Sequence, residues 1–409
     1  MKSEIIRKIL PNGLRVIHIK NKMNNVNLTV SVKVGSVNET KKNNGVSHFL
    51  EHMLWHGTSE LPEEKIRTEL KDKKANYNAN TSFKKTSYYI GSPKRHFERS
   101  VQILAEIIQN PEFDEKKIET EKNIILDEYK HYKDNPNYYI SELLVNKLFK
   151  DHPISKPIIG PKENIENMNK EILQKHYSDY YVPNNMVVTI VGNLKDPEQL
   201  VEKYFTSQSK EVPVLDLIEP VFNEQVITQV GKNTKATYIA LGFPGVCKTH
   251  KDMYIFEAIN YILNSGKEIN LLEAIRHKMA LTYSISASNN NFQETGFLAI
   301  STSTNKEKVD ETINLILLEL KKLETIKAKE LDLAKKFLLK VHKISNQFPF
   351  LLEQTVIQNE LYGYWGEYED TVNRIKAVTS KDVQRIAKQY FNKIHTTIIL
   401  EQESLESSN

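Results

Sequence analysis

Apolar and polar residues alternate in several short stretches of the chain, and this alternation predicts β-strands. Residues 4–20 alternate on both sides of the turn sequence PNGL at 11–14, which indicates a strand, a tight turn and a second strand. Residues 27–34 alternate in the same way, and residues 185–192 form the continuous apolar run of a buried strand. Residues 76–90, rich in Asn, Thr, Ser and Tyr, predict two polar-faced strands at a sheet edge.

Between these strands the apolar residues recur every three or four positions, which predicts helices. In the first half of the chain this spacing covers residues 45–56, a helix opened by LPEE at 61–64, and residues 96–110, 114–132, 138–150 and 169–180.

The second half of the chain repeats the order of the first. Residues 207–221 lack periodicity, carry two prolines and predict a linker. After it we expect strands at 237–243, 297–302 and 396–400, and helices at 254–263, 305–325, 328–343 and 381–391. The repeated order indicates a duplication. We therefore predict an α+β fold of two duplicated domains, residues 1–208 and 222–409, each a mainly antiparallel sheet covered by helices.

Composition narrows the class of protein. The chain has 409 residues, 39% of them hydrophobic and 26% charged, as in soluble globular proteins of two or three domains. A net charge of +4 without a basic block argues against a nucleic-acid partner and against a membrane-surface role. No apolar run approaches the roughly twenty residues needed to span a bilayer, and nothing marks the N-terminus for export. A lone cysteine, Cys247, excludes an internal disulfide. We expect a cytoplasmic protein.

His48, Glu51 and His52 form the pattern H-x-x-E-H inside the predicted helix 45–56. On a helix the two histidines lie four positions apart on one face, where both can bind one zinc ion that keeps a position open for water. Glu51 stands on the same side and can accept a proton from that water. The alternative is an ordinary amphipathic helix with two surface histidines, so a third ligand decides between them.

Glu121 and Glu128 share one face of the predicted helix 114–132 and supply candidates for that ligand. With them the chain resembles the pitrilysin-family, or inverzincin, zinc metallopeptidases of the small, two-domain, mitochondrial-processing-peptidase-like branch. The resemblance covers nearly the whole chain and rests on PNGLRV at 11–16, the segment 45–58, NANT at 78–81, TSYY at 86–89, E-x(6)-E at 121–128, IIGP at 158–161, GN at 192–193, and Arg276 with Tyr283. Lys74 departs from it, because relatives often have glycine there.

The resemblance implies a role for each matching residue. It makes His48, His52 and Glu128 the ligands of one Zn²⁺ per chain, Glu51 the general base and Glu121 the group that orients a ligating histidine. It also implies that Arg276 and Tyr283 hydrogen-bond the scissile peptide, and that the substrate contacts Trp55, Asn78 and Ala79. His56 is expected on the surface or behind the ligands, not as a ligand itself.

These residues predict a zinc endopeptidase that hydrolyses short or unfolded peptides. The family resemblance implies a homodimer, with a heterodimer of related chains as the other arrangement. Two rival functions are a non-catalytic partner subunit of a processing-peptidase-like heterodimer and a scaffold with a fortuitous motif. Degenerate subunits lose ligands or the base, whereas this chain keeps all of them. We therefore favour the active peptidase.

Overall fold

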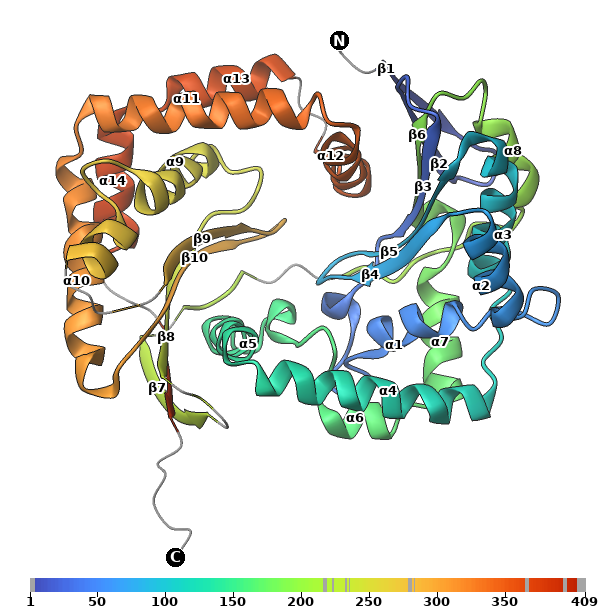
Figure 1. The fold of residues 1–409 in the computed structure, drawn as a ribbon, viewed down its shortest axis with the longest axis horizontal. Coiled ribbons are helices and arrows are strands. Elements are labelled where there is room, and N and C mark those ends of the chain that lie inside the picture. Colours follow the sequence, from blue (N-terminus) through green and yellow to red (C-terminus); the bar gives the residue numbers. More distant parts are fainter. Residues whose placement is uncertain are drawn as a thin grey trace, which may run out of the picture. The chain divides into compact units, whose positions relative to one another are not determined.

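A computed structural model gives the fold (Figure 1). It describes residues 4–215, 219–222, 224–231, 234, 236–278, 282, 284–364, 368–392 and 396–402. The chain forms two compact units, and each is built on one sheet with helices against it. The predicted α+β class with two similar halves is therefore confirmed.

The first unit comprises Met1–Tyr129, Lys156–Asp216 and Ile344–Trp365. Its six-stranded sheet has the order β1-β2-β6-β3-β5-β4, and only the pair β2–β6 is parallel. The strands are β1 (Glu4–Ile9), β2 (Arg15–Lys20), β3 (Asn25–Val32), β4 (Asn76–Thr81), β5 (Thr86–Pro93) and β6 (Met186–Gly192).

Helices cover both faces of this first sheet (Figure 1). Along β6, Val188 and Ile190 pack into the main core, whereas Val187 and Val191 point to the other face, which α12 covers with Leu352 and neighbouring residues. Two apolar faces explain why β6 is a continuous apolar run. The helices are α1 (Val46–Leu54), α2 (Glu63–Asp72), α3 (Phe97–Gln109), α4 (Glu115–Asp134), α6 (Lys162–Glu166), α7 (Lys170–Tyr180), α8 (Glu198–Tyr204) and α12 (Pro349–Tyr362).

The second unit repeats this plan with five strands in the order β7-β11-β8-β10-β9, of which only β7–β11 is a parallel pair. Its strands are β7 (Gln225–Gly231), β8 (Thr237–Gly245), β9 (Ile285–Asn291), β10 (Gly296–Thr304) and β11 (Thr396–Gln402). Its helices are α5 (Pro136–Leu148), α9 (Met253–Ser265), α10 (Val309–Lys322), α11 (Ala328–Ser345), α13 (Tyr368–Ala377) and α14 (Ser380–Tyr390).

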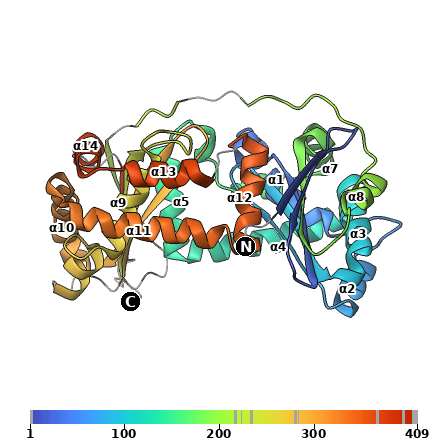
Figure 2. The same ribbon diagram turned by 90° about the horizontal axis from the view of Figure 1, so that it is seen from above.

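The two halves of the chain exchange one helix each. Helix α12 of the second half packs on the first sheet, as Figure 2 shows, and α5 of the first half packs on β8 and β11. At Gly242 the approach of α5 is so close that an added Cβ would lie 3.0 Å from Leu144. The compact units therefore differ from the predicted segments 1–208 and 222–409, which follow the order of the chain. Apolar periodicity predicts that one face of a helix is buried, but it does not indicate which sheet covers that face.

Most predicted elements agree with the structure to within a few residues, with one correction on the polar strands 76–90. Of the two strands in this segment, β4 is at the sheet edge, whereas β5 lies between β3 and β4, and most of its residues are buried. The prediction of two polar-faced edge strands was therefore wrong for β5, whose buried Ser87 and Thr86 bond to Ser31 and to the carbonyl of Val34, and whose Ser92 bonds to Ser100 of α3. Sequence reasoning did not predict β7, β9, α6, α8, α12 or α13.

Candidate metal centre

A buried carboxylate anchors the start of α1, the helix that carries H-x-x-E-H. Oε2 of Glu39 accepts hydrogen bonds from the backbone N–H of Gly45 (2.8 Å) and from the amide of Asn44 (2.7 Å). Oε1 accepts from the backbone N–H of Ser47 at 2.8 Å. The first turn of a helix leaves its N–H groups unpaired and carries partial positive charge, so the carboxylate satisfies both needs. The position of α1 is thereby fixed at its first residues.

The amphipathic pattern of α1 divides its residues as predicted. Phe49, Leu50 and Met53 are buried in the core of the first unit. His48 and His52 lie on the other side of the helix, with ring centroids 4.7 Å apart. Both histidines face Glu128 of α4, across the space between the two helices.

The structure brings His48, His52 and Glu128 together as the one group of potential metal ligands within its described residues. Nε2 of His48 lies 3.6 Å from Oε2 of Glu128, and Nε2 of His52 lies 3.7 Å from the same oxygen. Two ligands bound 2.0–2.2 Å from zinc at a tetrahedral angle are about 3.3–3.6 Å apart. The separations are too long for hydrogen bonds but fit two imidazoles and one carboxylate around a zinc ion.

The electrostatics of the two histidines suit a cation. Burial, with the neighbouring His52, lowers the pKa of His48 to about 3, so that this ring is neutral and has a lone pair to offer. Burial also lowers the pKa of His52, but the hydrogen bond and charge of Glu121, with the charges of Glu51 and Glu128, outweigh it and raise that pKa. Carboxylates that favour a proton on His52 equally favour a metal ion beside it.

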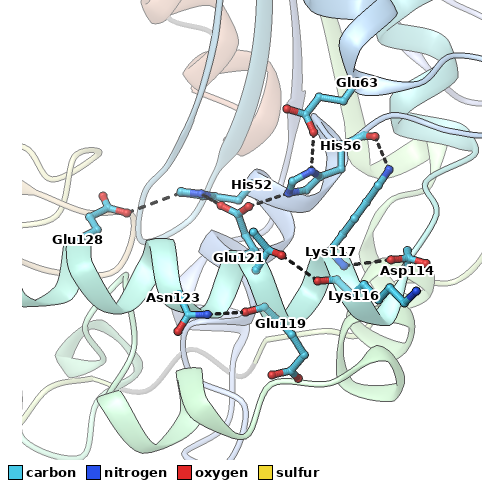
Figure 3. Close-up of polar contacts among 11 residues, drawn as sticks. His52, His56, Glu63, Asp114, Lys116, Lys117, Glu119, Glu121, Asn123 and Glu128 are labelled. Atoms are coloured by element: carbon cyan, nitrogen blue, oxygen red, sulfur yellow. Dashed lines mark hydrogen bonds and ion pairs between the residues drawn. The ribbon is translucent and has the colours of Figure 1, made fainter.

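Glu121 lies directly behind His52. Its Oε1 accepts a 2.7 Å hydrogen bond from Nδ1 of His52, which leaves Nε2 of that ring to face Glu128 (Figure 3). Burial raises the pKa of Glu121, but its hydrogen bonds to His52 and His56 prevail and lower it to about 2. An ionised carboxylate on the outer nitrogen of an imidazole fixes the ring and its tautomer.

His56 completes a network that sequence reasoning missed. Its Nε2 lies 2.6 Å from Oε2 of Glu121 and its Nδ1 lies 2.8 Å from Oε2 of Glu63 (Figure 3). Lys117 of α4 donates a hydrogen bond of 2.9 Å to the backbone carbonyl of His56. The four-residue spacing of His52 and His56 could have indicated that both side chains lie on one side. The turn at Gly57, which brings Glu63 close to His56, cannot be recognised from the spacing of residues.

Glu51 is held by the edge strand. The hydroxyl of Thr81, the last residue of β4, donates a 2.6 Å hydrogen bond to Oε2 of Glu51. Burial raises the pKa of Glu51, and the bond from Thr81 opposes that shift. A carboxyl with a raised pKa beside a candidate metal site is a stronger proton acceptor than an exposed glutamate, as general-base catalysis requires.

Three further predicted residues lie on or near β4. Trp55 follows the last residue of α1, is half-buried, and packs against Tyr77 of β4 at a ring-centroid distance of 4.9 Å. Asn78 is exposed on β4 and Ala79 is buried against the core. Because β4 pairs only with β5, its other edge carries the backbone groups available to a peptide.

The predicted Arg/Tyr pair is described only in part. Arg276 is exposed on the π-helical turn η5 (Leu272–Lys278) of the second unit. Tyr283 lies outside the described residues. The roles of both residues stay predictions.

Comparison with known proteins identifies the family. Residues 15–162 match the insulinase domain of peptidase family M16, and residues 167–338 match the peptidase M16 inactive domain. The chain belongs to peptidase family M16.

Relatives cover almost the whole chain. An uncharacterized zinc protease of Bacillus subtilis is 29% identical over 408 residues, which are 97% of this chain and 98% of that protein. A probable mitochondrial-processing peptidase subunit beta of Arabidopsis thaliana is 26% identical, over 93% of this chain and 75% of its own. A solved protease from Helicobacter pylori has the same fold, with a TM-score of 0.89 at 22% identity over 98% of this chain and 100% of that one. Several relatives of this chain are named zinc proteases.

Among the described residues, no helix combines the length and the apolar character needed to span a membrane.

Proposed function

We propose that this protein is a zinc-dependent endopeptidase that hydrolyses short or unfolded peptides. One observation carries the proposal: two imidazoles of α1 and the carboxylate of Glu128 on α4 form a candidate zinc site, and Glu51, held by a hydrogen bond, lies on α1 between those two histidines. The names of the relatives support the same class of reaction.

Each residue has a distinct task in the proposed reaction. His48, His52 and Glu128 hold one Zn²⁺ per chain. Zinc bound there supplies a Lewis acid that polarises water and the peptide carbonyl. Glu51 accepts the proton of the attacking water and passes it to the leaving amine. Glu121 keeps the ring of His52 in its binding orientation. From the family resemblance, Arg276 and Tyr283 hydrogen-bond the carbonyl oxygen as it gains negative charge.

The substrate binds as an added strand along the open edge of β4. Backbone groups of residues around Asn78 and Ala79 pair with the peptide, so that sequence selectivity is loose. Trp55, packed on Tyr77, favours an apolar or aromatic residue just after the cut. A stably folded protein has no free extended segment to offer, so only short or unfolded chains are good substrates.

Metal content and cleavage together test the proposal. We expect about one zinc per chain in the wild type and its loss in Glu128→Ala. Glu51→Gln should retain zinc but lose about 10²–10⁴-fold in turnover of a fluorogenic peptide, because the base is not a ligand. Glu64→Gln, an exposed glutamate on α2, is the control. A Glu51→Gln protein with near-normal turnover would contradict the mechanism.

The second candidate is a non-catalytic partner subunit of a heterodimer; its support is that relatives are named as subunits of the mitochondrial-processing peptidase. Peptide cleavage by the purified chain alone excludes it. We further propose that the working unit is a homodimer in the cytoplasm. Sedimentation of the pure protein and fractionation of cells that produce it test these two points.

A further inference from the structure

A continuous chain of hydrogen-bonded side chains leads away from the candidate zinc site. It runs from Nδ1 of His52 to Oε1 of Glu121 (2.7 Å), from Oε2 of Glu121 to Nε2 of His56 (2.6 Å), and from Nδ1 of His56 to Oε2 of Glu63 (2.8 Å) (Figure 3). This chain of side chains joins α1, α4 and α2, and its inner part is shielded, because the side chain of Glu121 is only 6% exposed.

The geometry fixes the protonation of His56. Both of its ring nitrogens face a carboxylate oxygen at hydrogen-bonding distance. An ionised carboxylate has no hydrogen to donate, so each ring nitrogen must carry one, and the ring is an imidazolium cation. Consistently, the hydrogen bond to Glu121, assisted by Glu63, outweighs burial and raises the pKa of His56.

We propose that His56 is a positioning residue, a cation that holds Glu121 against His52 and so sets the affinity and reactivity of the zinc site. This inference rests on the proposed function above. His56 does not touch the metal or the substrate; it acts through Glu121.

Two physical arguments support this role. First, Glu51, Glu121 and Glu128, when ionised, place three negative charges around one Zn²⁺ ion and its two neutral imidazoles, which leaves one negative charge over. The cation of His56, bonded to Glu121, balances it, while the ammonium of Lys117, bonded to the carbonyl of His56, offsets the carboxylate of Glu63. Second, Glu121 can hold the ring of His52 only if its own carboxylate cannot rotate. His56, tied to Glu63 and through its carbonyl to Lys117, prevents that rotation.

The experiment measures the affinity for Zn²⁺ alone, by competition with a chromogenic chelator, and separately kcat and KM on a fluorogenic peptide. His56→Ala should weaken zinc binding about 10–100-fold, the usual cost of losing a partner behind a metal ligand, and should lower kcat more than it raises KM. His56→Lys keeps a cationic donor and should restore both to within severalfold of the wild type. Glu63→Gln should weaken zinc binding only severalfold, because Glu63 is half exposed.

The outcomes separate the possible roles of His56. If His56→Ala binds zinc as the wild type does, or if His56→Lys restores nothing, the inference is overturned. Should His56→Ala fail to fold, Glu63→Gln against its neighbour Glu64→Gln decides, and equal zinc affinities in these two variants overturn it. A wild-type protein that binds zinc but cuts no peptide contradicts the proposed function, while the zinc affinities still decide the role of His56.

Discussion

Thr81 donates a 2.6 Å hydrogen bond from its hydroxyl to Oε2 of Glu51. Thr81 ends the edge strand β4, and Glu51 lies on the helix α1 between the two histidines of the candidate zinc site. In the proposed mechanism the strand that receives the peptide is thus bonded directly to the residue that activates water. In this mechanism the strand β4 both binds the substrate and orients Glu51.

Loss of this bond should slow hydrolysis without loss of metal. A hydrogen bond to a charged group contributes about 1.5–3 kcal/mol, so Thr81→Val should lower kcat roughly tenfold or more. Thr81→Ser keeps the hydroxyl and should retain most activity. Zinc content is measured in parallel and should stay at the wild-type level. Equal kcat values for the Val and Ser variants would show that the bond has no role in the reaction.

Glu39 should prove essential for the stability of the first unit. Glu39→Ala leaves the N–H groups of Gly45 and Ser47 without their buried acceptor. Each unpaired buried group costs about 1–3 kcal/mol, so we expect a loss of about 3 kcal/mol or more in the free energy of unfolding. Chemical denaturation measures it, with the exposed Glu60→Ala as control. A loss below about 1 kcal/mol would contradict the anchoring role.

Lys74 holds a backbone conformation that suits glycine. Its φ of 52° is left-handed, and the bonds from Lys74 N to Lys71 O (2.9 Å) and from Ala75 N to Leu70 O (2.9 Å) close α2 as a Schellman motif. Lys74→Gly relieves about 1–2 kcal/mol of strain and costs about 0.5–1 kcal/mol of chain entropy. We expect a net gain of about 0.5–1 kcal/mol in unfolding free energy. Lys73→Gly, at a position with negative φ, should destabilise instead.

The sequence predicted the parts of the site that depend on local helical periodicity. The pattern on α1 was enough to pair His48 with His52, whereas Glu128 was expected beside them only from the family resemblance; the structure places all three together. Lys74 was recognised as an unusual residue at that turn, and its positive φ gives the reason.

Other features depend on contacts between segments that no spacing announces. The hydrogen bond of Glu39 to α1 crosses a loop, and that of Thr81 to Glu51 joins residues 30 positions apart. Glu63 reaches His56 only because the chain reverses at Gly57, whose φ is 75°. The exchange of α5 and α12 cannot be predicted from the sequence either. Both sheets have a second apolar face, so the apolar face of each helix fits either sheet.

The packing of α12 should make stability depend on pH. Glu353 of α12 is fully buried against β3, where it accepts hydrogen bonds from Thr29 (2.6 Å) and Asn27 (2.8 Å). Burial raises its pKa from 4.5 to about 7, against the effects of these bonds and of the charge of Lys85. The folded state therefore binds more protons than the unfolded state between pH 4.5 and about 7, and stability falls as the pH rises through this window.

The same linkage gives the size of the effect and its test. A shift of this size corresponds to about 3 kcal/mol, and Glu353→Gln should remove this pH dependence. The free energy of unfolding, measured from pH 5 to pH 8, should fall more steeply in the wild type than in the variant. Glu171→Gln, an exposed glutamate of α7, should follow the wild type. Parallel curves for wild type and Glu353→Gln would refute the argument.

A mixture of two inactive variants tests whether active sites are shared within the proposed homodimer. Glu51→Gln removes the base, and Tyr283→Phe removes the proposed hydrogen bond to the carbonyl oxygen, so each variant alone should be nearly inactive. If Tyr283 of one chain serves the zinc site of the other, a mixed dimer has one site with both defects and one site with neither. Its activity should then reach about half of the wild-type level, since twofold symmetry gives each dimer two equivalent sites. Subunit exchange is followed with differently tagged chains, and zinc content confirms that both variants keep the metal. Exchange without any recovery of activity would show that Glu51 and Tyr283 of the same chain act together, or that the protein works as a monomer.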